Sequence, residues 1–158
     1  MMKIFGIGNI LLGDDGVGVR VVEKIKEEIK NISEDIDVII GETDYLYCLS
    51  QINQDDTIVI IDSTYLDITP GYVSYFDLKG CNKFIKYFNS QHESNLVKSI
   101  LIENLNIKGY LIGIEIDKVD FSLELSEVLN CKFNNICLEV LKYIREIYKE
   151  YARSINST

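Results

Sequence analysis

The chain has 158 residues, of which 47% are hydrophobic and 26% are charged, with one proline and ten glycines. This length and composition are typical of one globular domain and exclude a disordered or low-complexity protein. The formal net charge is −9, and the lysines lie scattered among glutamates. Because such a chain repels a polyphosphate backbone, we expect no nucleic-acid partner.

The cysteines and the N-terminal residues indicate the compartment. No C-x-x-C pair occurs, and one histidine cannot complete a zinc finger, so we expect reduced thiols that lie mostly in the core. Residues 1–12 lack the pattern of a signal peptide, and no stretch approaches the roughly 20 apolar residues of a membrane span. The sequence therefore predicts a cytoplasmic protein without membrane contact. The thiols are those of Cys48, Cys81, Cys131 and Cys137.

The first part of the chain alternates apolar runs with amphipathic segments. We predict strands at residues 3–8, 36–40 and 57–62, and helices from Val17 to Lys30 and over residues 45–52. Gly41 is expected to stop the second strand. The third strand is apolar along almost its whole length, which suits a strand covered on both faces in a parallel sheet.

The second part of the chain begins with a turn at Pro70-Gly71. The elements expected after this turn are an antiparallel edge strand at 72–78, an irregular stretch at 79–91, a helix at about 93–105, a strand at 110–116, a helical turn or two at 121–127 and a helix at about 132–152. We expect one domain over residues 1–152, with 153–158 frayed. The predicted fold class is α/β: a three-layer α/β/α sandwich around a mostly parallel sheet of about five strands.

One tempting interpretation of the first loop is a nucleotide-binding site. Gly6-x-Gly8 follows a strand and precedes a helix, as in the dinucleotide fingerprint. The third glycine position is Leu11, however, and Asp14-Asp15 lies where a pyrophosphate needs backbone N–H groups and no negative charge. No Gly-Lys-Ser/Thr follows a glycine loop, so a P-loop is excluded as well.

A better interpretation joins residues that are distant in sequence. If the second, first and third strands are neighbours, the loop after the first strand and the end of the third open into the same crevice. Asp15 and Asp62 then face each other, and His92, the only histidine, can reach the crevice from one side. Two carboxylates and an imidazole suit a divalent metal with open coordination positions.

Each of these residues also has an ordinary structural interpretation. Asp14 and Asp15 lie at the head of a helix, where acidic residues cap free N–H groups. Asp62 ends a strand and can bond the following loop, and His92 can be a surface residue. Both interpretations hold together if Asp14 caps the helix and Asp15 faces the crevice.

Three segments together carry a family resemblance. Residues 6–20, the strand end Ile60-Ile61-Asp62 and Ser90-Gln91-His92 resemble the hydrogenase maturation endopeptidases, which trim the C-terminus of nickel-iron hydrogenase large subunits. The resemblance implies that Asp15, Asp62 and His92 form the metal site and the catalytic centre. It also implies that the nickel is carried by the substrate, the hydrogenase large-subunit precursor, and is not permanently bound.

The resemblance implies an endopeptidase that removes a C-terminal peptide from the nickel-loaded precursor. The sequence has no H-E-x-x-H motif and no evident nucleophile pairing, which favours attack by water with Asp15 or Asp62 taking a proton. The alternative is a non-catalytic metal sensor or large-subunit chaperone on the same fold. The oligomeric state stays open.

The sequence departs from the family pattern at three places. Residues Gly41, Glu42 and Thr43, expected to bind substrate, stand with Asp44 where the family often has Gly-Gly-Thr. The last strand is followed by no proline, although the family commonly has one there. Some members have glutamate at position 15, so the Asp15 side chain is one methylene shorter.

Overall fold

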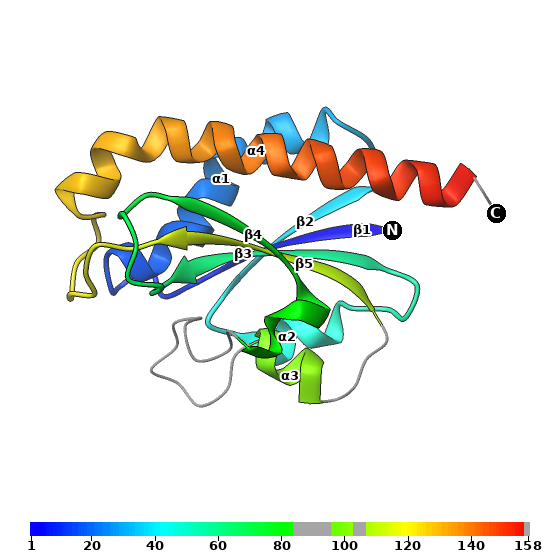
Figure 1. The fold of residues 1–158 in the computed structure, drawn as a ribbon, viewed down its shortest axis with the longest axis horizontal. Coiled ribbons are helices and arrows are strands. Elements are labelled where there is room, and N and C mark those ends of the chain that lie inside the picture. The colour runs from blue at the N-terminus through cyan, green and yellow to red at the C-terminus, as the bar shows by residue number, and fades with distance from the viewer. Residues whose placement is uncertain (84–95, 103–106, 157–158) are drawn as a thin grey trace.

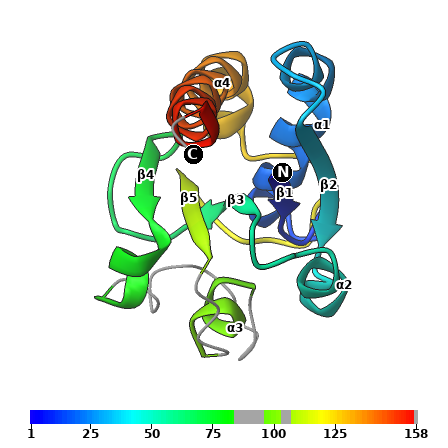
Figure 2. The same ribbon diagram turned by 90° about the vertical axis from the view of Figure 1, so that its right-hand side faces the viewer.

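The computed structural model describes residues 1–83, 96–102 and 107–156. Figures 1 and 2 show a twisted sheet with α1 and α4 on one face and α2 and α3 on the other. The strands are β1 (Met2–Ile7), β2 (Ile36–Glu42), β3 (Thr57–Thr64), β4 (Val73–Asp77) and β5 (Lys108–Glu115). The helices are η1 (Asp14–Gly16), α1 (Val17–Lys30), α2 (Tyr45–Ser50), η2 (Leu78–Lys83), α3 (Leu96–Ile102) and α4 (Glu127–Asn156).

The sheet has five strands in the order β2-β1-β3-β5-β4. Strand β1 pairs in parallel with β2 and β3, and β3 pairs in parallel with β5, whereas β4 lies antiparallel along the outer edge of β5. The expected α/β sandwich with a mostly parallel sheet and one antiparallel edge strand is confirmed. The expected neighbourhood of the second, first and third strands is confirmed as well.

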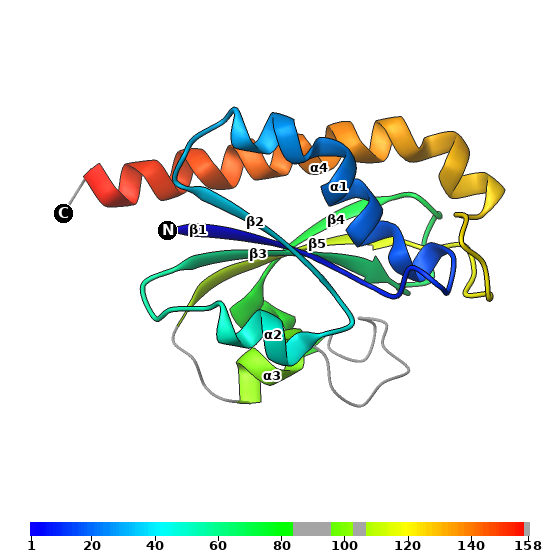
Figure 3. The same cartoon turned by 180° about the vertical axis from the view of Figure 1, so that it is seen from behind.

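Alternation along the strands divides the core into two clusters. On β1, Ile4 faces α1 and α4, while Phe5 faces α2 and α3. Every residue of β3 is buried, as its apolar run predicts for a central strand covered on both faces. The amphipathic pattern of α1 places Val21, Ile25 and Ile29 in the larger cluster. Figure 3 shows from behind that α1 lies on the same side of the sheet as α4.

Three predicted boundaries were wrong. Strand β2 continues through Gly41 to Glu42, because a bulge opposite β1 absorbs the irregularity that the glycine suggested. Residues 121–126 form no helical turn, since the chain here is held against the first loop by isolated bridges of Ser122 with Leu12 and of Val119 with Gly13. Helix α4 begins at Glu127 and runs through residues 153–156, which were expected to fray.

Three further observations bear on the sequence predictions. Of the helix expected at 93–105, residues 93–95 and 103–105 lie outside the described residues, and α3 accounts for the rest.

Within the ranges 1–83, 96–102 and 107–156, no helix combines the length and apolar character needed to cross a membrane. Cys48 and Cys137 are buried as expected, Cys131 is exposed, all three are free thiols, and the side chain of Cys81 lies outside the described part.

Candidate active site at the carboxyl end of the sheet

Asp15 and Asp62 come to the same end of the sheet from neighbouring strands. Asp15 lies in η1, which follows the loop after β1, and Asp62 lies near the carboxyl end of β3. Because β1 and β3 are parallel neighbours, both side chains are delivered to one edge. The sequence prediction that these two carboxylates lie together therefore agrees with the electrostatic interaction between them.

Two glycines permit the close approach of η1 and α1 to the sheet. Gly8 has a φ of +132°, and a Cβ there would lie 2.0 Å from the carbonyl oxygen of Asp15. At Gly18 a Cβ would lie 2.3 Å from the carbonyl oxygen of Ile61, the residue before Asp62. Since neither distance is possible for a real side chain, larger residues would push η1 and α1 away from β3.

Ser63 joins the two carboxylates in one hydrogen-bond network. Its hydroxyl donates to Asp15 Oδ1 at 3.2 Å, and its backbone N–H donates to Asp62 Oδ1 at 2.7 Å. The backbone N–H of Asn9 donates to the other oxygen of Asp15 at 3.0 Å. Ser63 is fully buried. The sequence did not predict a role for it, because a serine that follows an aspartate near a strand end is common and indicates no particular function.

The electrostatics of Asp62 distinguish it from an ordinary buried carboxylate. Burial, followed by the negative charge of Asp15, raises the pKa of Asp62 to about 8, against only a small lowering by the Ser63 N–H. No lysine or arginine is ion-paired with either carboxylate within the described part of the chain. Two adjacent acidic groups without a cation form a site that favours binding of a positive ion.

Asp14 does not cap the helix, contrary to the expectation. Neither η1 nor α1 has a side-chain cap hydrogen bond at its start. Its carboxylate instead accepts three backbone N–H bonds from the loop after β5, namely from Asp117 at 3.1 Å, Lys118 at 3.3 Å and Ser126 at 2.7 Å. The buried Asp14 thus fixes residues 117–126 beside the candidate site.

The remaining predicted site residues are His92 and the segment of Gly41, Glu42 and Thr43. His92 lies outside the described residues, so its expected place beside Asp15 and Asp62 stays a prediction. Among the described residues, no three His, Cys, Asp or Glu side chains form a metal-binding group. Gly41 is buried with no room for a side chain, since a Cβ would lie 2.3 Å from Cys48 Sγ, whereas Glu42 and Thr43 are exposed.

The exposed Glu42 is linked directly to the loop that carries Asp15. Its carbonyl oxygen accepts the N–H of Gly8 at 3.0 Å, and its φ of +47° is uncommon for a residue with a side chain. Asp44, by contrast, has a structural role, because its side chain accepts the Tyr47 N–H at 2.9 Å and caps α2.

A further buried acid orders the chain beyond Asp62. Glu115, at the end of β5, accepts hydrogen bonds from the Thr64 hydroxyl at 3.0 Å and from the N–H groups of Leu66 at 2.9 Å and Ile68 at 3.3 Å. These hydrogen bonds fix the segment that follows β3 next to the site. A glutamate inside an otherwise apolar strand was the available signal in the sequence.

The buried thiols are not activated nucleophiles. Burial raises the pKa of Cys48 and of Cys137 to about 11, with the nearby Asp44 adding to the shift at Cys48. Both thiols therefore stay protonated near neutral pH. The chemistry available at this edge of the sheet is that of carboxylates.

The fold and the site define a class: a doubly wound α/β protein with paired carboxylates at the carboxyl edge of its sheet. The model of the hydrogenase maturation protease family, HycI, matches residues 19–143 of the chain. The chain therefore belongs to the hydrogenase maturation protease family. The expected resemblance and the expected enzyme class, a peptidase, are confirmed.

Two curated relatives illustrate the similarity. A putative hydrogenase maturation protease from Methanocaldococcus jannaschii is 30% identical over 108 residues, which cover 67% of this chain and 68% of that protein. The hydrogenase expression/formation protein HupD from Rhizobium leguminosarum is 34% identical over 68 residues. That shorter match covers 43% of this chain and spans only 33% of the length of HupD.

Solved structures show the same fold over nearly the whole chain. The hydrogenase maturating endopeptidase HybD from E. coli superimposes with a TM-score of 0.74 at 20% identity, covering 92% of each chain. The maturation protease HycI from Thermococcus kodakarensis KOD1 gives a TM-score of 0.66 at 26% identity, covering 94% of this chain and 92% of that chain.

Proposed function

We propose that this protein removes a C-terminal peptide from the nickel-loaded large-subunit precursor of a nickel-iron hydrogenase. Asp15, Asp62 and His92 bind the nickel that the precursor carries. The observation that supports this assignment is the adjacency of Asp15 and Asp62, joined through Ser63, without a cationic partner among the described residues.

The donor set fits a divalent ion that arrives with its own ligands. Asp15 and Asp62 supply carboxylate oxygens, and His92 supplies an imidazole nitrogen, which borderline metals accept. A positive ion between the carboxylates would relieve their mutual repulsion and the burial of Asp62. Nickel is therefore part of the substrate in this proposal, and its ligands in the precursor complete the coordination.

The proposed reaction is hydrolysis of a peptide bond near the bound nickel. Water attacks the carbonyl carbon, the C–N bond breaks, and one proton of the water is transferred to the departing amine. Of the two carboxylates, the half-buried Asp15 is the more accessible to water, so we assign it the proton transfer. The nickel polarises the carbonyl or lowers the pKa of the attacking water.

The segment of Gly41, Glu42 and Thr43 is proposed to bind the substrate, with the exposed Glu42 and Thr43 making the contacts. This placement is supported by the hydrogen bond between the Glu42 carbonyl and Gly8, which connects the exposed end of β2 to the loop that leads to Asp15. Gly41 contributes by letting α2 pack closely, and the exposed Glu42 and Thr43 provide the contact surface.

The test is incubation with nickel-loaded and nickel-free precursor from the same host, with mass spectrometry of the released peptide. We expect cleavage of the nickel-loaded form and none in the double variant Asp15→Ala, Asp62→Ala. Asp37→Asn, an exposed aspartate on β2, is the matched control and is expected to cleave normally. Cleavage that survives the double substitution, or that is equal without nickel, would contradict the proposal.

Nickel-dependent binding of the precursor without cleavage would instead identify a non-catalytic chaperone on this fold. We also propose that the reaction takes place in the cytoplasm, which agrees with the free thiols of Cys48, Cys131 and Cys137. Fractionation of the host followed by immunodetection tests this location.

A further inference from the structure

Three large apolar side chains are exposed beside the candidate site. Leu11 is 56% exposed, Phe121 is 93% exposed and Leu123 is 67% exposed. They come from two segments that lie side by side, because Ser122 donates its N–H to the Leu11 carbonyl at 3.1 Å and Leu12 forms a bridge with Ser122. We call Leu11, Phe121 and Leu123 the apolar platform. Clustered apolar exposure of this kind marks interaction surfaces in proteins.

The backbone under the apolar platform is fixed at several points. Asp14 binds both ends of the 117–126 loop through three N–H groups. Between these ends, Gly13 donates to the Ser122 carbonyl at 2.8 Å, and the Arg20 guanidinium donates to the Leu123 carbonyl. A surface ordered in advance loses little conformational entropy when a partner binds, so these contacts favour recognition.

The apolar platform lies at the same end of the sheet as the candidate active site. Asp14, which holds the loop, directly precedes Asp15 in η1, and Leu11 lies on the same connection between β1 and η1. Figure 1 shows residues 117–126, in yellow, at the same end of the sheet as the η1 turn. We therefore expect a partner segment that reaches Asp15 to pass close to Phe121 and Leu123.

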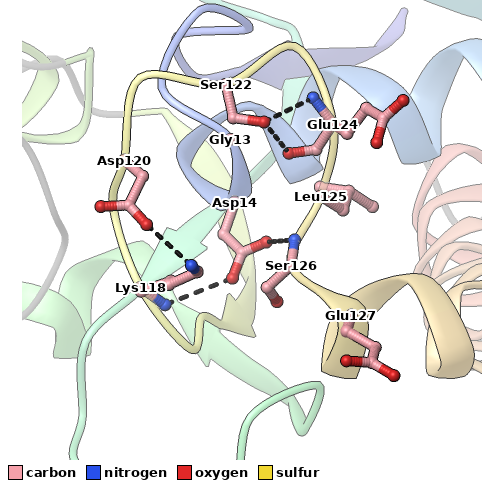
Figure 4. A pocket seen from close by; sticks show the side chains of 9 residues that line it. All are labelled: Gly13, Asp14, Lys118, Asp120, Ser122, Glu124, Leu125, Ser126 and Glu127. Atoms are coloured by element: carbon pink, nitrogen blue, oxygen red, sulfur yellow. Dashed lines mark hydrogen bonds and ion pairs between the residues drawn. The ribbon is translucent and has the colours of Figure 1, made fainter.

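The surroundings of the apolar platform carry negative charge. Residues 117–127 contain four acidic residues and one lysine, a formal charge of −3. A recess of about 190 Å³ opens beneath the loop, with Glu124 and Glu127 at its rim (Figure 4). Within the described ranges, these two glutamates have no ion-pair partner, whereas Lys118 is paired with Asp120 at 2.8 Å. The complementary partner presents apolar side chains flanked by lysine or arginine.

We propose that the apolar platform docks an apolar segment of the hydrogenase large-subunit precursor that carries lysine or arginine beside its apolar side chains. The inference rests on the proposed function and adds the surface and the chemistry by which the substrate is held. Phe121 is the expected anchor, since aromatic side chains buried at the centre of an interface contribute most to binding.

The first test is the double variant Phe121→Gln, Leu123→Gln, with Leu138→Gln as the matched control. Leu138 is 65% exposed on α4, so its substitution changes as much exposed apolar surface as Leu123→Gln at a different place. We expect the double variant to bind nickel-loaded precursor at least roughly tenfold more weakly, and to raise KM with kcat unchanged. The control is expected to match the wild type.

The second test concerns the charge complementarity. Glu124→Gln is expected to lower the association rate and to weaken its dependence on ionic strength, because steering by exposed charges is screened by salt. Glu139→Gln, an exposed glutamate on α4, is the matched control. Equal effects of the two substitutions would assign the salt dependence to the net charge of −9 and overturn a local acidic contact.

Measuring both binding and cleavage distinguishes a wrong docking surface from a wrong proposed function. If the double variant binds and cleaves like the wild type, the docking surface is wrong and the proposed function stands. If the wild type neither binds nor cleaves the nickel-loaded precursor, both fall. A third outcome is that the apolar platform binds a second copy of the chain, and sedimentation velocity tests this. In that case the double variant would lose self-association while its binding of the precursor stayed unchanged, which would overturn the proposed docking surface.

Discussion

Two buried aspartates at opposite ends of β3 have opposite electrostatic surroundings. Asp56, just before the strand, accepts hydrogen bonds from Asn53 and forms ion pairs with Lys3 Nζ at 2.9 Å and with the N-terminal ammonium at 3.4 Å. Burial alone would raise the pKa of Asp56, but the Lys3 and Asn53 contacts outweigh it and the pKa is lowered. Asp62 has one N–H donor and an anionic neighbour, and its pKa is raised to about 8.

The comparison shows that the buried charge at one end of β3 serves stability and the buried charge at the other end is suited to function. At its amino end the buried charge is neutralised by cations from the same chain, so the arrangement stabilises the fold. At its carboxyl end the charge has no cationic partner among the residues that the structure describes, so the arrangement costs stability and is available for a positive ion from outside. Asp14 is a third case, in which three backbone N–H groups hydrogen-bond a buried carboxylate.

The largest expected effect is the difference in cleavage activity between substitutions at the two ends of β3. Asp62→Asn is expected to lower cleavage of the precursor by at least about 10²-fold, because it removes a carboxylate that binds the substrate's nickel in the proposed site. Asp56→Asn is expected to leave kcat unchanged at a temperature where the variant is folded. Rates of peptide release under single-turnover conditions measure both, and equal losses in the two variants would refute the functional division of the strand.

The next largest effect is on stability, and here the substitution of Asp56 is expected to be more damaging than that of Asp62. Asp56→Asn leaves Lys3 and the N-terminal ammonium without their common partner, so we expect the free energy of unfolding to fall by about 3 kcal/mol. Urea unfolding followed by circular dichroism measures this value. Asp55→Asn, the exposed neighbour, is the matched control, and a fall of similar size in that variant would show that the ion pairs are not the cause.

Asp62→Asn is expected to stabilise the metal-free protein by about 1–2 kcal/mol near neutral pH, since folded Asp62 must either take up a proton that the unfolded chain does not bind or carry a buried charge repelled by Asp15. The pKa of Asp62 is higher in the folded state, at about 8, than in the unfolded chain, at about 3.9. Its contribution to stability is therefore complete below about pH 3.9 and is lost as the pH rises through about 8.

The advantage of the asparagine variant should accordingly grow between these two pH values. Unfolding curves of wild type and Asp62→Asn at several pH values test this sign. For Asp56, whose pKa is lowered in the folded state, the sign is reversed: its contribution is present above the unfolded pKa and disappears as the pH falls. A pH-independent difference between wild type and Asp62→Asn would contradict the assignment of a raised pKa.

The sequence predicted the parts of this arrangement that depend on local pattern. The apolar runs predicted which segments are strands, and the parallel order of β1 and β3 follows from the doubly wound connection, which is why the meeting of Asp15 and Asp62 was predictable. The partners of Asp14 lie about a hundred residues away, so helix capping was the natural local interpretation and was wrong. The contacts of Glu115 depend on strand register in the same way.

The smallest effect is expected at Ser63, which connects the two carboxylates. Ser63→Ala removes the hydroxyl that donates to Asp15 but keeps the backbone N–H that donates to Asp62. Losing one buried hydrogen bond should cost about 1 kcal/mol of stability. If the hydroxyl orients Asp15 for reaction, kcat falls while KM is unchanged, and the pH dependence of kcat shifts. Loss of stability with an unaltered pH profile would reduce Ser63 to a packing residue, and the paired carboxylates would then be oriented by the backbone of η1 and β3 alone.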